Sequence, residues 1–355
     1  MNVIIAGGGT GGHLMPGIAV AREILRRHPD SRILFVGAER GIEKRVVPEA
    51  GFELMTLRVG GLKRTGWRQR AANLASLAFA LVRAMRIVVR FHPDAVVGLG
   101  GYASFPVMAA ATVSGIPRLV MEQNVIPGLA NRLVGRFATL VAVPDPAAAA
   151  HFGRRAVVTG NPVRPEFKNI PPPSNGTRTD VLVTGGSQGA EPINRAVMEA
   201  LPHLAGFGNR LRFVHQTGER QVGEVRAAYR NAGFQSRVES FFPDFASQYA
   251  AADLVVCRAG ATTVAEIRAS GRAAVFIPLE FAADDHQRKN ARRMVEGNAA
   301  VMIDPRELSG ERLAAEISGL IGDPARLEEL GRNARRMAVL DAESKIVDLI
   351  ERMTR

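Results

Sequence analysis

Two stretches decide the fold of this 355-residue chain: Val3-Ile4-Ile5-Ala6-Gly7-Gly8-Gly9 at its start and Val181-Leu182-Val183-Thr184-Gly185-Gly186-Ser187 near its middle. Each is a short apolar run that ends in a glycine turn, which is typical of a buried strand leading into a helix. Gly8 and Gly185 lie 177 positions apart, half of the chain. The repeat predicts two domains of the same design, and the length suits two.

Further apolar runs extend this pattern in both halves. In the first half, the runs 33–36, 95–99, 119–121 and 140–143 alternate with helical stretches at 17–27, 71–90, 105–114 and 129–137. In the second half, strand candidates lie at 211–215, 254–257, 274–277 and 301–303. Apolar strands separated by helices indicate parallel sheets covered on both faces. The sequence therefore predicts an α/β fold of two Rossmann-like domains whose parallel sheets face each other across a cleft, with ligands at the carboxyl ends of the strands.

Dense proline and glycine mark the boundary between the domains. The segment Gly160-Asn161-Pro162-Val163-Arg164-Pro165 is followed closely by three further prolines at 171–173. We expect an N-terminal domain over 1–160, a linker over 161–176 and a C-terminal domain over 177–341. Residues 342–355 have a helical pattern, and this helix could dock back on the first domain.

The composition limits the environment and the partners. The single cysteine, Cys257, allows no disulfide within the chain, and the start lacks a secretory signal, so we expect a reducing cytosol. A net charge of +12 favours an anionic partner. Residues 54–93 contain no acidic residue and eight lysines and arginines, among apolar side chains and the only tryptophan, Trp67. No nucleic-acid-binding motif accompanies this segment, and its apolar run is too short to span a bilayer. It is either a surface that lies on anionic lipid or a core helix with arginines at its edge.

Three glycine turns follow predicted strands. Gly7, Gly9 and Gly12 match the pattern G-x-G-x-x-G ahead of a helix expected to begin near Pro16. Glycine-lined helix starts favour an anion, so several such turns predict more than one phosphate group, on a donor and on an acceptor. A tight turn without a ligand is one alternative. A nicotinamide site with Glu39 on the ribose is another.

The segment Arg258 to Glu266 directly follows a predicted strand and opens a helix. We place Thr262 or Thr263 near its N-cap and Glu266 about a turn further on. A diphosphate at the helix start with Glu266 on the ribose hydroxyls is one interpretation, and a purely structural capping box of Thr263 and Glu266 is the other. Asp284-Asp285-His286-Gln287 could recognise sugar hydroxyls or simply start a helix. No D-x-D or zinc-ligand spacing occurs, so we expect no metal and no cofactor, and charge on a leaving diphosphate falls to helix N-termini and basic side chains.

Taken in order, these motifs resemble one family over nearly the whole chain, the MurG family of bacterial glycosyltransferases. The landmarks are 8–13, Gly100-Gly101-Tyr102, Glu122-Gln123-Asn124, 160–164, 185–190 and 261–266. The resemblance implies a GT-B fold and inverting transfer of N-acetylglucosamine from UDP-N-acetylglucosamine to undecaprenyl-diphosphate-N-acetylmuramyl-pentapeptide (lipid I), which yields lipid II for peptidoglycan. It also implies a peripheral position on the cytoplasmic leaflet of the inner membrane, held by anionic lipids, which favours the membrane interpretation of residues 54–93.

The resemblance also assigns roles to single residues. Contacts to UDP-N-acetylglucosamine are expected from Thr10, Gly11, Gly12, Asn124, Arg164, Ser187, Phe242, Ala261, Thr262, Thr263, Val264, Ala265, Glu266 and Gln287, with Phe242 acting through its backbone. Gly9, Gly100, Gly101 and Tyr102 are expected at the acceptor diphosphate. His13 is the first candidate for the base that accepts the proton of the acceptor's C4 hydroxyl, and Glu122 is the second. Orientation of a phosphate is the alternative role for His13.

The sequence leaves four other functions open. A UDP-N-acetylglucosamine 2-epimerase and a diacylglycerol glycosyltransferase share the two-domain architecture. A nicotinamide-dependent dehydrogenase would use the first glycine turn. A non-catalytic sensor would bind the sugar nucleotide and release no UDP.

Overall fold

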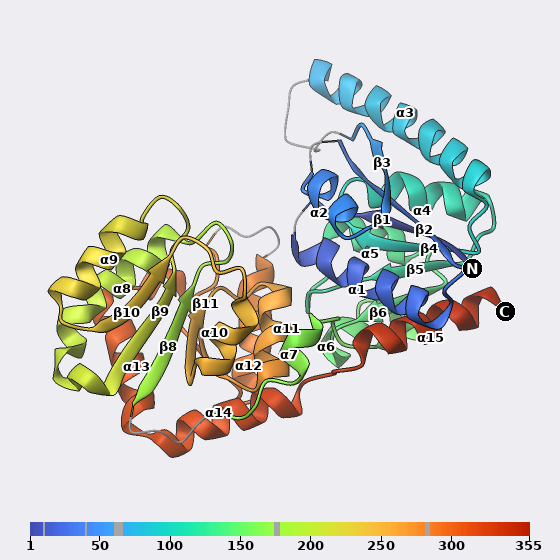
Figure 1. Ribbon diagram of the computed structural model, residues 1–355. Coiled ribbons are helices and arrows are strands. Elements are labelled where there is room, and N and C mark those ends of the chain that lie inside the picture. Colours follow the sequence, from blue (N-terminus) through green and yellow to red (C-terminus); the bar gives the residue numbers. More distant parts are fainter. Residues whose placement is uncertain (10, 40, 60–66, 174–177, 281–284) are drawn as a thin grey trace. The chain divides into compact units, whose positions relative to one another are not determined.

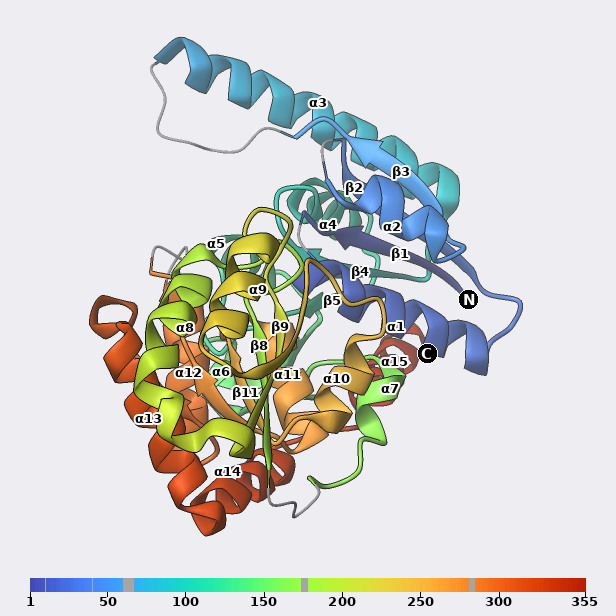
Figure 2. The ribbon, with the colours of Figure 1, turned by 60° about the vertical axis from the view of Figure 1, so that its left-hand side comes forward.

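The computed structural model describes residues 1–9, 11–39, 41–59, 67–173, 178–280 and 285–355, with the backbone alone for 67–75. Its contacts divide the chain into two compact units. Unit 1 comprises Met1–Pro162 and Asp341–Arg355, and unit 2 comprises Val163–Leu340. Figures 1 and 2 show each unit as a sheet between layers of helices. The predicted α/β class is therefore confirmed.

Unit 1 contains a seven-stranded, entirely parallel sheet of order β3-β2-β1-β4-β5-β6-β7. Alternate residues of the opening run face opposite sides: Val3 and Ile5 pack under α1 and α15, while Ile4 and Ala6 pack under α3 and α4. The strands are β1 (Asn2–Gly7), β2 (Arg32–Ala38), β3 (Glu53–Leu57), β4 (Ala95–Gly100), β5 (Arg118–Met121), β6 (Leu140–Val143) and β7 (Ala156–Val158). The helices are α1 (Gly11–Arg27), α2 (Glu43–Glu49), α3 (Trp67–Phe91), α4 (Ser104–Val113), α5 (Leu129–Gly135), α6 (Pro146–Ala149) and α15 (Ala342–Thr354).

Unit 2 repeats this order with six parallel strands, β10-β9-β8-β11-β12-β13. β8 thus corresponds to β1, and the repeat seen in the sequence is a repeat of the fold. Both sheets have the strand order of dinucleotide-binding domains, which reverses beside the first strand. The strands are β8 (Thr179–Thr184), β9 (Leu211–Gln216), β10 (Gln235–Glu239), β11 (Leu254–Cys257), β12 (Ala273–Phe276) and β13 (Val301–Met302). The helices are α7 (Pro165–Lys168), α8 (Glu191–Leu204), α9 (Val222–Asn231), α10 (Phe245–Ala251), α11 (Ala261–Ser270), α12 (His286–Glu296), α13 (Gly310–Gly322) and α14 (Pro324–Arg336).

Two boundaries differ from the prediction. α1 begins at Gly11, five residues before Pro16, so Gly11, Gly12 and His13 form its first turn. The predicted linker is also not a separate segment in its described part: residues 163–173 belong to unit 2. α7 lies within this stretch and buries Phe167 completely against the sheet core.

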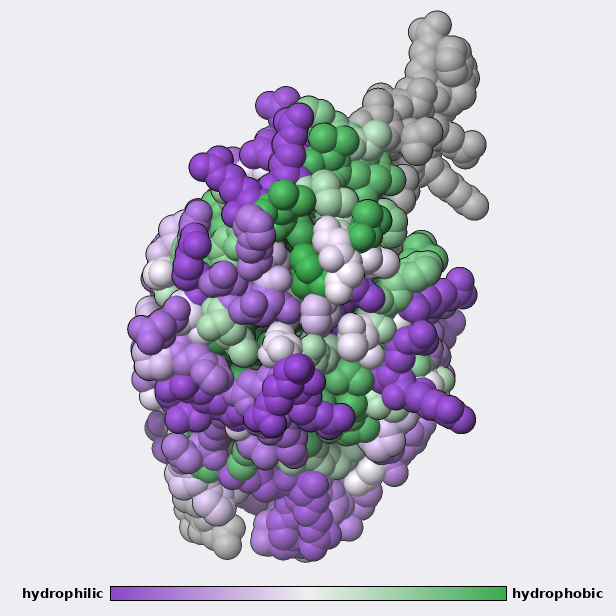
Figure 3. Space-filling view, turned by 90° about the vertical axis from the view of Figure 1, so that its right-hand side faces the viewer, coloured by the Kyte–Doolittle hydropathy of each residue, from purple (hydrophilic) through white to green (hydrophobic). Residues whose placement is uncertain are grey.

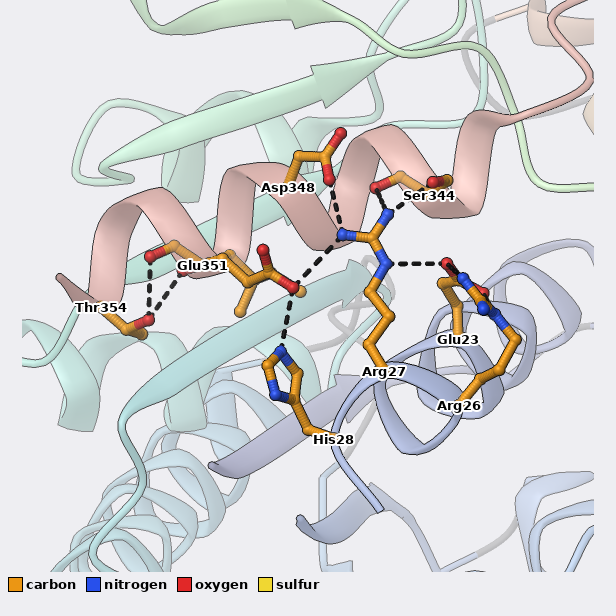
Figure 4. A network of polar contacts seen from close by, with 9 residues as sticks. Glu23, Arg26, Arg27, His28, Ser344, Asp348, Glu351 and Thr354 are labelled. Atoms are coloured by element: carbon orange, nitrogen blue, oxygen red, sulfur yellow. Dashed lines mark hydrogen bonds and ion pairs between the residues drawn. The ribbon is translucent and has the colours of Figure 1, made fainter. Parts of the chain in front are cut away.

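The chain returns to unit 1 through α15, which packs along α1 (Figures 1 and 4). Arg27 at the end of α1 lies at the centre of the polar contacts between them. Its guanidinium binds Glu23 at 2.8 Å, Asp348 at 2.6 Å and Glu351 at 3.2 Å, and donates to the Ser344 carbonyl oxygen at 3.0 Å. Hydrogen bonds from Arg26 and Arg27 lower the pKa of Glu23 to about 2 against the opposing effect of burial. The C-terminal helix is therefore an integral part of unit 1.

Replacement of Arg27 by alanine should loosen α15. Arg27 contacts three carboxylates, of which Glu23 and Glu351 are shielded at 10% and 22% exposure while Asp348 is 56% exposed. Its removal weakens all three contacts at once and costs about 2 kcal/mol of unfolding free energy. Urea denaturation measures the loss, and hydrogen exchange should accelerate in α15. Arg26→Ala is the matched control, because Arg26 is 69% exposed and pairs with Glu23 alone; an equal loss in both variants would contradict the central role of Arg27.

Candidate functional site

The glycine turns after β1 and β4 touch each other backbone to backbone. A Cβ on Gly7 would overlap the Gly100 carbonyl oxygen, and a Cβ on Gly101 would lie 2.9 Å from the Gly8 carbonyl oxygen. Gly7, Gly8, Gly100 and Gly101 all have positive φ, between 79° and 138°. These glycines are therefore required by the close approach of two loops at the point where the strand order reverses.

A buried carboxylate supports the first of these turns. Glu43 is 1% exposed, and its Oε1 accepts the Gly9 N–H at 2.7 Å. A Cβ on Gly8 would lie 2.5 Å from the same oxygen, and a Cβ on Gly41 would overlap Oε2, which has no hydrogen-bond partner among the residues that the structure describes. The Gly9 amide, expected at the acceptor diphosphate, is thus held by Glu43. The first turn of α1, residues 11–13, lies at the positive end of the helix dipole, as in any α-helix.

His13 lies in this first turn, and its Nδ1 is 2.6 Å from Oε1 of Gln123. The neighbouring Glu122, 2% exposed, accepts hydrogen bonds from the Asn124 N–H at 2.8 Å and from Nδ2 of Asn131 at 2.9 Å. Glu122 thus fixes the loop after β5 with both carboxylate oxygens. Three predicted site residues, His13, Glu122 and Asn124, are brought together in this way. Thr10 lies outside the described residues, and the Tyr102 side chain is 56% exposed.

In unit 2, the glycine turn after β8 packs against the turn after β9. Cβ atoms on Gly189 and Gly218 would overlap the carbonyl oxygens of Thr217 and Gln188. Ser187 is exposed at the tip of the turn. As in unit 1, the two turns can approach this closely because glycine has no side chain.

Gln216, at the end of β9, ties this turn to Phe242. Its Nε2 donates to the Gly186 carbonyl oxygen at 3.0 Å, and its Oε1 accepts the Phe242 N–H at 2.9 Å. The Phe242 side chain is 2% exposed, so it belongs to the core. The expected backbone contact of Phe242 is accordingly limited to its carbonyl group, since its N–H is already bound. Sequence reasoning missed Gln216, because one glutamine at a strand end gives no pattern.

The helix after β11 begins without a side-chain cap. Gly260 is the N-cap of α11, so Ala261, Thr262 and Thr263 occupy its first three positions. Thr263 is therefore not the N-cap, and the capping box of Thr263 and Glu266 is excluded. The first turn of α11 instead presents backbone N–H groups and the positive end of the helix dipole.

Glu266 pairs with a residue 102 positions away. Arg164 donates to its Oε1 through Nη2 at 2.9 Å and through Nε at 3.2 Å, and the guanidinium lies over the Phe167 ring at 4.6 Å. Burial raises the pKa of Glu266, and Arg164 acts in the opposite direction. The structure therefore brings two predicted donor residues, Arg164 and Glu266, into one ion pair beside the start of α11.

Gln287 lies in the first turn of α12, where its Oε1 accepts the Leu279 N–H at 3.0 Å. A cavity of about 260 Å³ is lined by Leu279, Glu280 and Arg258, which follow β12 and β11, and by residues of α8. Arg258 is anchored there, since it donates to the carbonyl oxygens of Ile277 and Pro278. Asp284 lies outside the described residues. Unit 2 thus has a concavity beyond the carboxyl ends of β11 and β12.

Two further observations concern the nicotinamide alternative and metal binding. Glu39, which a nicotinamide site would need for the ribose, forms an ion pair with Arg58 at 3.1 Å. Among the residues that the structure describes, no group of three or more His, Cys, Asp or Glu side chains could hold a metal ion.

One layer of unit 1 exposes apolar and basic side chains together. On α3, Phe79, Val82 and Val89 are 53–58% exposed and share a face with the exposed Arg83, Arg86 and Arg90. Val113 at the end of α4 and Phe137 after α5 are 79% and 63% exposed. Figure 3 shows an apolar area of this kind with hydrophilic side chains around it. Lys63 and Arg64 lie outside the described residues, as do the side chains of Trp67, Arg68 and Arg70.

Comparisons with known proteins agree with this architecture. The glycosyltransferase family 28 N-terminal domain matches residues 3–143, and the family 28 C-terminal domain matches residues 180–352. A UDP-N-acetylglucosamine–N-acetylmuramyl-(pentapeptide) pyrophosphoryl-undecaprenol N-acetylglucosamine transferase of Citrifermentans bemidjiense is 48% identical over 98% of each chain. The crystal structure of Acinetobacter baumannii MurG superimposes with a TM-score of 0.83 at 30% identity, over 99% of both chains. A UDP-N-acetylglucosamine 2-epimerase structure from Listeria monocytogenes, described as putative, has a TM-score of 0.66 at 15% identity over 99% of this chain and 95% of its own, which shows the fold alone.

The support of the first glycine turn by Glu43 can be tested with Gly41→Ala. Its methyl group would overlap Glu43 Oε2 and displace the carboxylate from the Gly9 N–H, at a cost of about 2 kcal/mol. In a Glu43→Ala background the same change should cost little, because the steric conflict is gone. Urea denaturation of the two single variants and the double variant measures this coupling. Additive losses would contradict the role of Glu43.

Proposed function

The chain belongs to glycosyltransferase family 28 and within it to the MurG family, and on this premise we propose that it transfers N-acetylglucosamine from UDP-N-acetylglucosamine to the C4 hydroxyl of lipid I. It is a UDP-sugar-dependent hexosyltransferase with the GT-B fold, and the product is lipid II, a precursor of peptidoglycan. The observation that carries this proposal is the 48% identity, over 98% of both chains, to a relative named for this reaction.

The donor, in this proposal, binds unit 2. The first-turn N–H groups of Ala261 and Thr263 and the dipole of α11 attract the diphosphate, and no side-chain cap competes for them. Glu266, held by Arg164, accepts hydrogen bonds from the ribose hydroxyls. Ser187 and the Phe242 carbonyl group complete the nucleotide contacts. Gln287 and the adjoining cavity receive the sugar.

The acceptor binds unit 1. Its diphosphate lies near Gly9, with Gly100, Gly101 and Tyr102 on the adjoining loop, beside the donor contacts expected from Gly11 and Gly12. The acceptor's C4 oxygen attacks the anomeric carbon, the bond from that carbon to UDP breaks with inversion, and the proton passes to His13. Negative charge that develops on UDP is stabilised by the start of α11 and by Arg164. We assign Glu122 to the support of the loop instead of to proton transfer, because Asn124, Gly128 and Asn131 already donate to its two oxygens.

His13→Ala should lower turnover with lipid I about 100-fold or more, the usual contribution of a general base, and change the donor KM little. Acceptor-dependent release of UDP is the measurement. His151→Ala, an exposed histidine of the same unit, is the control. Unchanged turnover in His13→Ala would remove His13 as the base. UDP release or epimerisation without any acceptor would instead favour a 2-epimerase, and transfer to diacylglycerol would favour the lipid glycosyltransferase.

We further propose that unit 1 lies on the cytoplasmic leaflet through the exposed face of α3 and the ends of α4 and α5. Among the described residues, no helix has both the length and the hydropathy to cross a bilayer. Apolar side chains interleaved with arginines suit a surface of anionic lipid, where each basic residue contributes about 1 kcal/mol.

Binding to vesicles tests this proposal. Val82→Glu combined with Val89→Glu should weaken sedimentation with vesicles of anionic phospholipid at least about 10-fold, because it removes apolar area and adds repulsion. Turnover with a water-soluble acceptor analogue should not change. Val295→Glu, at a 42% exposed position of unit 2, is the control. Equal binding of the variant and the wild type, or equal binding to neutral vesicles, would contradict the proposal.

A further inference from the structure

Gln123 is a buried amide in direct contact with the proposed base. Its Oε1 lies 2.6 Å from Nδ1 of His13, and its side chain is almost fully shielded, with 3% of the residue exposed. The motif Glu122-Gln123-Asn124 contains this residue, but the sequence assigned a role only to its two neighbours, Glu122 and Asn124. The question is what a neutral amide does at this position.

The hydrogen-bond network fixes which end of the amide faces the histidine. Nε2 of Gln123 donates to the Met121 carbonyl oxygen at 3.1 Å, so Oε1 is the atom directed at His13. An oxygen can only accept, and the Nδ1 of His13 must therefore carry a proton. Reversing the amide would bring Oε1 against the Met121 carbonyl oxygen and lose that hydrogen bond. The network thus assigns to neutral His13 the tautomer with its proton on Nδ1, which leaves Nε2 as the nitrogen that accepts a proton.

The surroundings keep Gln123 in place. The backbone carbonyl oxygen of Gln123 accepts a hydrogen bond from Nδ2 of Asn161 at 2.7 Å, and Asn161 lies near the end of the first segment of unit 1. On one side β5 ends at Met121, and on the other Glu122 fixes Asn124 and Asn131. A side chain whose neighbours are this well bonded has little freedom, and such a rigid supporting layer is what a precise site requires.

We propose that Gln123 is a positioning residue: it locks His13 in the Nδ1–H tautomer and so keeps Nε2 available to deprotonate the acceptor hydroxyl. This inference rests on the proposed function, in which His13 is the base. A neutral amide also suits this position better than a carboxylate would. It accepts the N–H without adding a negative charge near the first turn of α1, where the proposed acceptor diphosphate binds.

Nitrogen NMR of the full-length protein with ¹⁵N-labelled histidine tests the tautomer directly. The chain has seven histidines, and His13→Ala identifies the signals of His13. In the wild type, the protonated nitrogen of neutral His13 should be Nδ1. In Gln123→Met, which keeps the size but not the acceptor, this preference should be lost. In Gln123→Glu, which keeps an oxygen acceptor, it should persist. Gln235→Met, at an exposed position of β10, is the control for both readouts.

Turnover provides the second readout. Gln123→Met should lower kcat with lipid I at least about 10-fold, part of what a general base contributes, with the donor KM within about twofold of the wild type. Gln123→Glu should retain more kcat and show a higher KM for the acceptor, because a carboxylate repels its diphosphate. Wild-type kcat in Gln123→Met, or an unaltered Nδ1–H tautomer, would overturn the proposal. If Gln123→Met does not fold, Gln123→Glu alone decides, since loss of the tautomer there also overturns it.

Different results would contradict the base His13, the positioning role of Gln123 and the proposed function. If His13→Ala keeps its turnover, the assignment of the base is wrong whatever the NMR of Gln123→Met shows. If His13→Ala is inactive but Gln123→Met matches the wild type in either readout, the base stands and the positioning role of Gln123 is wrong. If the wild type releases no UDP with lipid I, the proposed function itself is wrong.

Discussion

The site depends on glycine turns that pack backbone to backbone at the ends of the first strands. In unit 1, Gly7 meets Gly100 and Gly101 meets Gly8; in unit 2, Gly189 meets the turn after β9. Positive φ values and the lack of side chains make these approaches possible. The glycines therefore serve mainly to bring loops together. In our proposal, the helix starts of α1 and α11 bind the anions.

Buried polar side chains fix the loops beside these proposed sites. In unit 1, Glu43 takes up the Gly9 amide, and Glu122 and Gln123 fix the loop beside His13. In unit 2, Gln216 joins the glycine turn to the backbone of Phe242. Removing such groups from water is costly unless every donor and acceptor is matched, so they define one geometry of the site. Among these groups, Oε2 of Glu43 is the exception: it has no hydrogen-bond partner in the described part of the chain and lies against Gly41.

Much of the fold could be predicted because the central strands are continuous apolar runs. The three strands that escaped prediction, β3, β7 and β10, all lie at sheet edges, where short or partly exposed sequences carry little periodic signal. Pro16 misled the prediction of the start of α1, since proline is common at a first helical position and here lies inside the helix. The motifs located Arg164 and Glu266 but not their ion pair. Glu43, Gln123 and Gln216 escaped because a single buried polar residue has no period or spacing. The site residues assigned by resemblance remain predictions until ligand binding is measured.

In our proposal, backbone amides at the start of α11, together with Glu266, hold the donor diphosphate and ribose without help from a side-chain cap. Amide hydrogen exchange with and without UDP measures this directly. UDP should slow amide hydrogen exchange most strongly in residues 261–266 and near Ser187. Protection confined to the turn after β1, with residues 261–266 unchanged, would contradict it.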